Sequence, residues 1–236
     1  FQRNSRFPEM VQGDTRASVA AVRLGENRIA EIFTRFGTGV VAATFASLIE
    51  ECAAIVRAEM QKAFPEGDWS FHEHVDDDGH GHGPFAIRLA LSSHDGRITL
   101  DATATDDQAV GPINYLMHPD VPRMIFGIAM LAGRTDVLLN HGAVRALDEV
   151  LLRPGSLLQP LSPAPLGQRG VTLVRVISGC CGLIGMATRG QSVAASNVYG
   201  LYYLRGRDDR DQPFLLTDGV AVGCGARPFA DGTDAV

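Results

Sequence analysis

The residues best placed to do chemistry lie near the end of the sequence, in the stretch 214–235. This stretch combines four glycines with Asp218, Arg227 and Asp231. Glycine permits positive φ and lets a backbone approach a ligand closely, and the fork of an arginine can hold a carboxylate or phosphate. The spacing matches neither the P-loop nor the dinucleotide-binding pattern. A set of tight turns with an internal Arg–Asp pair explains the same composition. Asp218, Arg227 and Asp231 are therefore candidate substrate-binding residues, with turn formation as the alternative.

A second group of polar side chains follows an expected strand. Asp101 ends that strand, and Gln108 and Asn114 lie in the polar segment after it. Loops at strand ends often carry function because a rigid scaffold positions them. Ordinary turn capping would need the same residue types. Asp101, Gln108 and Asn114 join the candidate substrate-binding residues on this basis.

Four histidines flank a run of three aspartates, in the sequence His72, His74, Asp76–Asp78, His80 and His82. Imidazoles and carboxylates are ligands for zinc, iron and manganese. Alternation places His72 and His74 on one strand face, and His80 and His82 on the loop beyond it. Asp-Asp-Asp-Gly also makes a good turn without a metal, and glycines between histidines give little rigid support. We expect a solvated turn, with a metal site as the weaker alternative. The sequence offers no complete active site, since it lacks a serine nucleophile elbow, a zinc-protease helix motif and a Cys–His pairing.

Composition excludes several classes of protein. The 236 residues are 45% hydrophobic and 20% charged, which is enough for one large or two small cores and does not fit a disordered chain. The net charge of −6 argues against a nucleic-acid partner. We find no apolar run of the roughly 20 residues that a membrane span needs, and no leader. The four cysteines include no CxxC spacing and are typical of a reducing cytoplasm. We therefore expect a cytoplasmic protein without a bound cofactor of its own.

The first quarter of the chain is predicted to form a helical hairpin. Apolar residues recur at helical spacing after Asp14, which we expect to cap the first helix. A second helix is expected over about 40–63, ended by Phe64-Pro65-Glu66-Gly67. We assign residues 1–67 to a helical segment.

Residues 68–236 are predicted to form an α+β domain with a mainly antiparallel sheet and packed helices. Strands are expected at 69–75, 85–91, 97–103, 144–152 and 198–205, and another begins at 214. His94-Asp95-Gly96 is typical of a hairpin turn. Helices are expected at 121–132 and 172–186, the second rich in small residues and therefore closely packed against a neighbour. Residues 153–165 form a proline-rich connector.

Several weak motifs, in order along the whole chain, resemble those of one family. They are Arg6-Phe-Pro8 with Gly13-Asp14 and Ala17; Gly25 with Arg28; Arg57 with Pro65 and Gly67; Asp76 to Gly79; Asp101 with Thr105, Gln108 and Gly111 to Asn114; Asn140 with Gly142; Pro154-Gly-Ser156; Pro163-Ala-Pro165; Thr172 with Arg175; and Gly223, Gly225 and Asp231-Gly232. Together they resemble the hydantoinase B/oxoprolinase family, the B-type subunit of ATP-dependent hydantoinases, oxoprolinases, caprolactamase and the acetone and acetophenone carboxylases.

The resemblance implies a subunit of a cytoplasmic hetero-oligomer. Its A-type partner would be an actin-like ATPase that binds ATP and Mg²⁺ and activates the substrate by phosphorylation. The B-type subunit would then assist hydrolysis of a cyclic amide, or carboxylation of a ketone-derived enol phosphate. A scaffold that serves only subunit contacts is the third possibility.

The resemblance also implies that a divalent metal of some members lies in an N-terminal half, upstream of residue 1. Both ends of the chain look cut, which predicts that it is an internal portion of a longer polypeptide. The histidine-rich turn at His72 to His82 matches no motif of the family.

Overall fold

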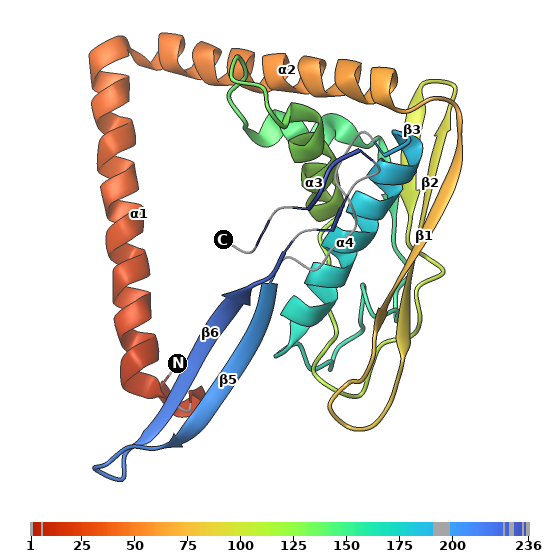
Figure 1. Cartoon of the computed structure of the whole chain (residues 1–236). Coiled ribbons are helices and arrows are strands. Elements are labelled where there is room, and N and C mark those ends of the chain that lie inside the picture. The colour runs from red at the N-terminus through yellow and green to blue at the C-terminus, as the bar shows by residue number, and fades with distance from the viewer. Residues whose placement is uncertain are drawn as a thin grey trace. The chain divides into compact units, whose positions relative to one another are not determined.

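The computed structural model describes residues 2–5, 7–190, 199–223, 225–226, 229–232 and 234. The chain divides into two compact units, Phe1–Glu50 and Glu51–Val236. Figure 1 shows the helices and strands of both units.

Unit 1 is built from helix. A short 3-10 helix, η1 (Gln2–Asn4), precedes α1 (Pro8–Phe36), and α2 (Thr38–Ala63) begins in this unit. Pro8 stands at the first turn of α1, where its missing N–H costs nothing. Gly37 separates the two helices at φ 83°, a conformation that glycine adopts without strain. No described residue of α1 is buried.

Unit 2 contains a four-stranded sheet in the order β1-β2-β3-β4. The strands are β1 (Gly67–Val75), β2 (Phe85–His94), β3 (Arg97–Asp101) and β4 (Glu149–Leu151). β1, β2 and β3 pair antiparallel, and β4 pairs parallel with β3. Asp95 and Gly96 connect β2 to β3, both at positive φ, as a tight two-residue hairpin requires.

α4 (Arg169–Ala187) packs on this sheet, and other helices complete the core beside it. α4 contacts β1 and β2, and α3 (Asp120–Leu131) contacts both α4 and the 3-10 helix η2 (His141–Ala146). The later part of α2 supplies Val56 and Met60 to the same core, and Phe64 follows directly after the helix. Figure 1 shows α4 running beside β1 and β2.

Close packing of α4 depends on its small residues. A Cβ at Gly182 would lie 2.5 Å from the ring of Phe71, and a Cβ at Gly179 would lie 2.8 Å from Leu89. A larger residue at Gly182 would have to displace the ring of Phe71, and one at Gly179 the end of the Leu89 side chain, for the helix to stay this close to β1 and β2. The expectation of a closely packed small-residue helix is confirmed.

The last two strands form a separate sheet of unit 2, which we call the arm. β5 (Tyr199–Arg207) and β6 (Pro213–Ala221) pair antiparallel along their whole length. Every residue of β6 is exposed. The arm ends in the turn 208–212.

The α+β class, with helices ahead of a mainly antiparallel sheet, is confirmed. Two boundaries differ from expectation. Asp14 lies inside α1 rather than capping it, because Pro8 already starts the helix. The strand expected at 144–152 is a 3-10 helix followed by the three-residue β4, because Asn140 caps the turn by accepting a hydrogen bond from Gly142 N at 2.7 Å.

Among the described residues, α2 and α4 are long and apolar enough to cross a membrane by length and composition alone. The apolar stretches of these two helices are thus longer than we expected from the sequence. In α4, 56% of the apolar window is buried.

Candidate functional site

Three long connections of unit 2 meet at one end of the four-stranded sheet. They are residues 76–84 between β1 and β2, 102–119 between β3 and α3, and 152–168 between β4 and α4. We call them the loop cluster. Their backbones are joined directly, because Gln108 N donates to Gly155 O at 2.9 Å and Leu157 N donates to Asp106 O at 2.9 Å. Such long irregular loops stay ordered only where their polar groups find partners.

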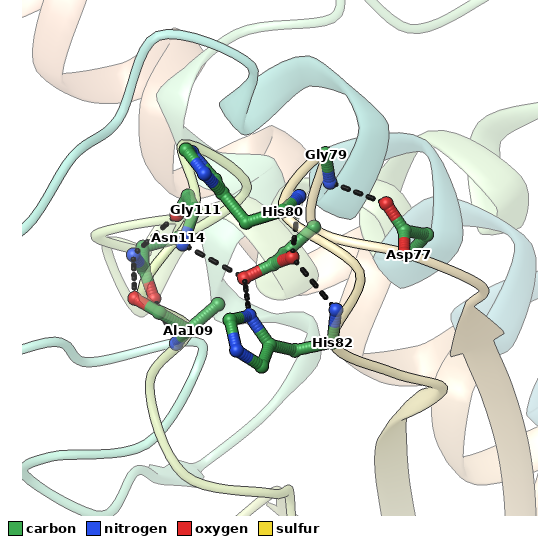
Figure 2. A network of polar contacts seen from close by, with 8 residues as sticks. Asp77, Gly79, His80, His82, Ala109, Gly111 and Asn114 are labelled. Carbon is green, nitrogen blue, oxygen red and sulfur yellow. Dashed lines mark hydrogen bonds and ion pairs between the residues drawn. The ribbon is translucent and has the colours of Figure 1, made fainter.

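The carboxylate of Asp78 holds the first loop to the second. Asp78 is 1% exposed. Its Oδ1 accepts from the backbone N–H groups of His80 at 2.9 Å and His82 at 3.2 Å. Its Oδ2 accepts from Gly111 N at 2.9 Å and lies 3.1 Å from the ring Nδ1 of His82. Figure 2 shows, as dashed lines, the contacts of the backbone nitrogens of His80, His82 and Gly111 with this carboxylate.

These bonds fix the ionisation state of Asp78. Burial would raise the pKa of its carboxyl, but the N–H donors of His80, His82 and Gly111 outweigh burial and hold the pKa well below its ordinary value. Asp78 is therefore a carboxylate at neutral pH and can only accept hydrogen bonds. The Nδ1 of His82 must then carry the proton that it donates, so the neutral ring keeps its lone pair on Nε2. The His82 side chain is 58% exposed.

Asn114 closes the second loop onto itself and onto the third. Its Oδ1 accepts from Ala109 N at 2.8 Å. Its Nδ2 donates to the carbonyls of Ala109 at 2.9 Å and Pro165 at 3.1 Å, with a third contact to Gly111 O at 3.2 Å. The side chain is fully buried. Its amide therefore bonds backbone groups that would otherwise be buried without partners (Figure 2).

Close approach of two backbones explains a glycine in this cluster. A Cβ at Gly111 would lie 2.0 Å from the carbonyl oxygen of Asp78. Any other residue there would push the second loop away from the first and break the bond between Gly111 N and Asp78.

Ion pairs anchor the rest of the second loop. Asp106 pairs with Arg88 of β2 and accepts from Ala86 N at 2.7 Å. Burial would raise the pKa of Asp106, but the Ala86 N–H and the Arg88 guanidinium lower it below its ordinary value. Arg153 of the third loop pairs with Asp107 at 2.9 Å. Its guanidinium also donates to the carbonyls of Thr103 and Thr105.

Three predicted substrate-binding residues lie in or beside the loop cluster. Asp101, at the end of β3, accepts from Thr103 N at 2.7 Å. The amide of Gln108 exchanges two hydrogen bonds with the backbone of Leu161. Asn114 is buried as described above. Each side chain thus holds loop backbone, and a role in binding substrate stays a prediction.

The other candidates lie elsewhere. Asp218 is on β6 of the arm, where its Oδ2 accepts from the hydroxyl of Tyr202 at 3.1 Å. Asp231 is exposed. Arg227 lies outside the described residues. The sequence grouped these three by proximity along the chain, and a role for them in binding substrate stays a prediction.

The four histidines split into two groups. His72 and His74 point outward from β1, on the face opposite Phe71 and Glu73, as alternation predicts. His80 and His82 lie in the first loop of the cluster. Among the described residues, no group of three or more His, Cys, Asp or Glu side chains is arranged to hold a metal ion. We therefore derive no chemistry through a metal in this part of the chain.

Sequence reasoning missed the role of Asp78. It treated Asp76, Asp77 and Asp78 alike as turn residues, and only the fold shows that one of them is buried against Gly111. The sequence did contain a signal for this role. His82 follows Asp78 by four residues, a spacing at which a carboxylate and an imidazole can pair locally. Arg88 was also missed, since its alternating strand gave no sign of a partner 18 residues away.

The chain matches a known protein family over its full length. The family model described as hydantoinase B/oxoprolinase matches residues 1–236. A protein of Pseudomonas sp. (strain NS671), provisionally named as the B-type subunit of a D-/L-hydantoinase, is 27% identical over 191 residues. These residues cover 75% of this chain and 30% of that protein.

Two solved structures share the fold. The ATP-dependent caprolactamase from Pseudomonas jessenii superposes with a TM-score of 0.77 at 22% identity, covering 99% of this chain and 41% of that one. A nucleotide-free acetone carboxylase superposes with a TM-score of 0.78 at 15% identity, covering 98% of this chain and 33% of that one.

The chain thus spans about a third of the length of these relatives. The family match nevertheless includes every motif noted in the sequence, from Arg6 to Gly232. The chain belongs to the hydantoinase B/oxoprolinase family.

Proposed function

We propose that this chain is part of the B-type subunit of an ATP-dependent complex that hydrolyses cyclic amides. The observation that carries the proposal is the family match over residues 1–236, supported by the fold shared with an ATP-dependent caprolactamase. The provisional name of the Pseudomonas relative, a hydantoinase subunit, points to the same class of substrate.

The complex would divide the chemistry between chains. An A-type partner with an actin-like fold would bind ATP and Mg²⁺ and phosphorylate the amide oxygen of the ring. Phosphorylation makes the ring carbon a better electrophile for water. The B-type subunit would shape the chamber in which water attacks, and the complex would work in the cytoplasm.

The loop cluster is the part of this chain best suited to that task. Its three loops are held by buried bonds at Asp78 and Asn114, so its exposed groups are positioned on a rigid support. His82 presents an exposed imidazole whose tautomer is set by Asp78. A neutral imidazole with a free Nε2 can accept a proton from water, and His82 is our candidate for that role.

A second reaction has specific support. The fold is shared with an acetone carboxylase at a TM-score of 0.78. Carboxylation would use the same ATP-dependent activation on a ketone, with bicarbonate as the carbon source. A subunit that serves only as a scaffold would need the same contacts and no chemistry.

The test starts with native isolation of the protein from its own cells, together with every chain that co-purifies and is identified by mass spectrometry. We expect an actin-like ATPase chain and the polypeptide that supplies the rest of the B-type subunit. Hydantoins, 5-oxoproline and caprolactam are then assayed for ring opening with ATP, and ketones for carboxylation with bicarbonate.

Ring opening that depends on ATP, with ADP released in step, supports hydrolysis. Formation of a carboxylated product without ring opening would instead support the second reaction, ketone carboxylation. A chain that isolates alone, and adds nothing to either reaction, would leave only the scaffold.

A further inference from the structure

A pocket of 460 Å³ lies in unit 2, where three helices end. Its walls come from the end of α2 and the residue Pro65, from the later part of α3, and from the end of α4 with the two residues after it. The apolar part of the lining is Ala63, Ala129, Met130 and Ala187. Its charged residues are Glu59, Lys62 and Arg189. Small-molecule sites have volumes of roughly 300–1,000 Å³ and combine an apolar lining with a few polar groups, so this pocket has the size and composition of one.

The pocket and the loop cluster lie at opposite ends of the four-stranded sheet. Pro65 lines the pocket and comes two residues before β1, whereas the loop cluster begins where β1 ends. Nine residues of strand span about 30 Å. α4 covers a similar distance: Gln168 N, at its start, donates to Pro112 O of the loop cluster at 2.8 Å, and Thr188, directly after its end, lines the pocket. A small molecule in the pocket is therefore bound at a site separate from the loop cluster.

The charges around the pocket leave two cations available to a ligand. Glu59 is already paired, because its Oε1 lies 3.0 Å from Nη1 of Arg134, and Arg134 also pairs with Asp136 at 2.6 Å. The Nζ of Lys62 is 3.9 Å from Glu59 Oε2, and the Lys62 side chain is 81% exposed. No hydrogen bond or ion pair of the Arg189 side chain is found among the described residues. The pocket thus favours an anion, and its apolar lining favours one that carries a short hydrocarbon chain.

The backbone of Arg189 has a conformation that is uncommon for arginine. Its φ is 54°, in the left-handed region that glycine usually adopts after the end of a helix. Gly190 N donates to Gly185 O at 2.7 Å and Arg189 N donates to Met186 O at 3.2 Å, so hydrogen bonds fix this turn. Non-glycine residues in this region occur often at binding sites. The turn holds the start of the Arg189 side chain at the pocket.

The rest of a longer polypeptide is the competing occupant, since the chain spans about a third of the length of its relatives. Lysine and glutamate are depleted in the cores of protein interfaces, yet both line this pocket. A covering polypeptide would take Lys62 and Arg189 out of water, at a cost that only paired charges offset. A small acid pairs with both and leaves the rest of each side chain in water. The chemistry of the lining therefore favours a small molecule.

We propose that this pocket binds a small organic acid, whose carboxylate is held by Lys62 and Arg189 and whose short apolar chain lies along Ala129 and Met130. The inference rests on the proposed function for the source of the acid. Hydrolysis of a cyclic amide converts the ring carbonyl to a carboxylate, and carboxylation of a ketone also adds a carboxylate. Both reactions release a ligand of this class, so the pocket is a site for product at a distance from the loop cluster.

The experiment uses Lys62 as its own probe, because it is the only lysine among the 236 residues. Reductive methylation with ¹³C-formaldehyde labels this side chain and the α-amino group of the chain, and it keeps the positive charge. Hexanoate is then added, and the methyl signal of Lys62 is followed by NMR. Acetate lacks the apolar chain and hexan-1-ol lacks the charge. Arg189→Gln removes one cation, and Arg97→Gln is the matched control, since Arg97 is an arginine of β3 outside the pocket whose side chain is 69% exposed.

We expect hexanoate to shift the Lys62 signal to saturation, and acetate and hexan-1-ol to bind at least tenfold more weakly. Arg189→Gln should weaken hexanoate binding about tenfold, because a charge-assisted hydrogen bond is lost. Arg97→Gln should bind within about twofold of the unmodified chain. In the complex isolated from its own cells, hexanoate should slow the methylation of Lys62, measured by mass spectrometry of peptides.

Three results overturn the inference: no shift of the Lys62 signal with hexanoate, equal binding by Arg189→Gln and the unmodified chain, or a Lys62 that cannot be methylated in the isolated complex. The third result would make the rest of the polypeptide, or a partner chain, the occupant of the pocket. Each of these results leaves the proposed function intact if the complex opens cyclic amides or carboxylates ketones. A complex that does neither but binds hexanoate at Lys62 would end the proposed function and leave an acid-binding pocket without that source of ligand.

Discussion

At the scale of single residues, the molecule depends on two buried polar side chains that bond almost entirely to backbone. Asp78 accepts from two loops, and Asn114 bonds a second loop to a third. A buried carboxylate with several N–H donors is stable because its donors replace the water it has lost. The polar side chains of Asp78 and Asn114 hold the loops in place. The groups that remain available to a substrate are the exposed residues beside them.

Replacing Asp78 by Asn should lower the melting temperature clearly. An amide presents an NH₂ group to two of the N–H donors that the carboxylate satisfies, so buried donors lose their acceptor. Asp77→Asn is the control, since Asp77 is exposed and an Asn there can still accept from Gly79 N. Calorimetry of both variants tests this prediction, which is wrong if the two have the same melting temperature.

Stability should also depend on pH through Asp78. Its pKa is lowered in the folded state from an ordinary value of 3.8. The unfolded chain therefore binds a proton first as pH falls, and the stabilisation from the carboxylate is present above pH 3.8 and is lost progressively below it. Between about pH 2 and pH 5, melting temperatures should fall more steeply with acid in the unmodified chain than in Asp78→Asn. Equal slopes would show that Asp78 is not linked to folding.

His82→Asn tests the proposed proton acceptor. Asn can still donate a hydrogen bond toward Asp78 but offers no basic nitrogen. If His82 takes a proton from water, the complex should lose about 10²-fold or more in kcat while the melting temperature changes little. His72→Asn, on the outward face of β1, is the matched control and should retain activity. An active His82→Asn complex would remove His82 from the mechanism.

At the scale of elements, helices pack where small residues allow close approach. A Cβ at Gly127 of α3 would lie 2.3 Å from the carbonyl oxygen of Ala143 in η2. That neighbour is backbone and cannot rotate away as a side chain can. The contact between α3 and η2 therefore requires glycine at this position.

Gly127→Ala should destabilise unit 2 by about 1–3 kcal/mol, because a core that is already full must shift to accept the methyl group. Gly25→Ala in α1 is the opposite case, since nothing lies within 4 Å of its added Cβ. Alanine there should add helix stability of about 0.5–1 kcal/mol. Chemical denaturation followed by circular dichroism measures both, and a neutral Gly127→Ala would show that α3 and η2 are less tightly packed.

At the scale of the whole molecule, the two units contribute unequally to the core. The part of α2 after Glu50 carries Val56 and Met60 into the core of unit 2, and Phe64 just after it joins them, whereas no described residue of α1 is buried. The sequence places a boundary at residue 67, and the compact units divide at residue 50.

Shortened chains distinguish these boundaries. A chain that begins at residue 51 keeps the core of unit 2 and should melt within a few degrees of the whole chain. A chain that begins at residue 68 loses Met60 and Phe64, whose removal one at a time would already cost about 2–5 kcal/mol each. It should be strongly destabilised or unfolded. Equal melting of the two shortened chains would support the boundary at 67.

The sequence by itself determined what depends on local periodicity and turn chemistry. Alternation located β1, β2 and β3, the Asp95-Gly96 turn located their hairpin, and helical spacing located α2, α3 and α4 to within a few residues. The ordered motifs were enough to identify the family, whose model matches residues 1–236.

Only the tertiary structure decided which polar residues are buried and which remain available. Asp77 and Asp78 are equivalent in a sequence, yet one is exposed and the other lies against Gly111, which is 33 residues away. Arg88 and Asp106 likewise pair across 18 residues. The physical reason is that burial and hydrogen bonding at a loop are set by whichever distant backbone packs there, and no short-range pattern encodes that partner.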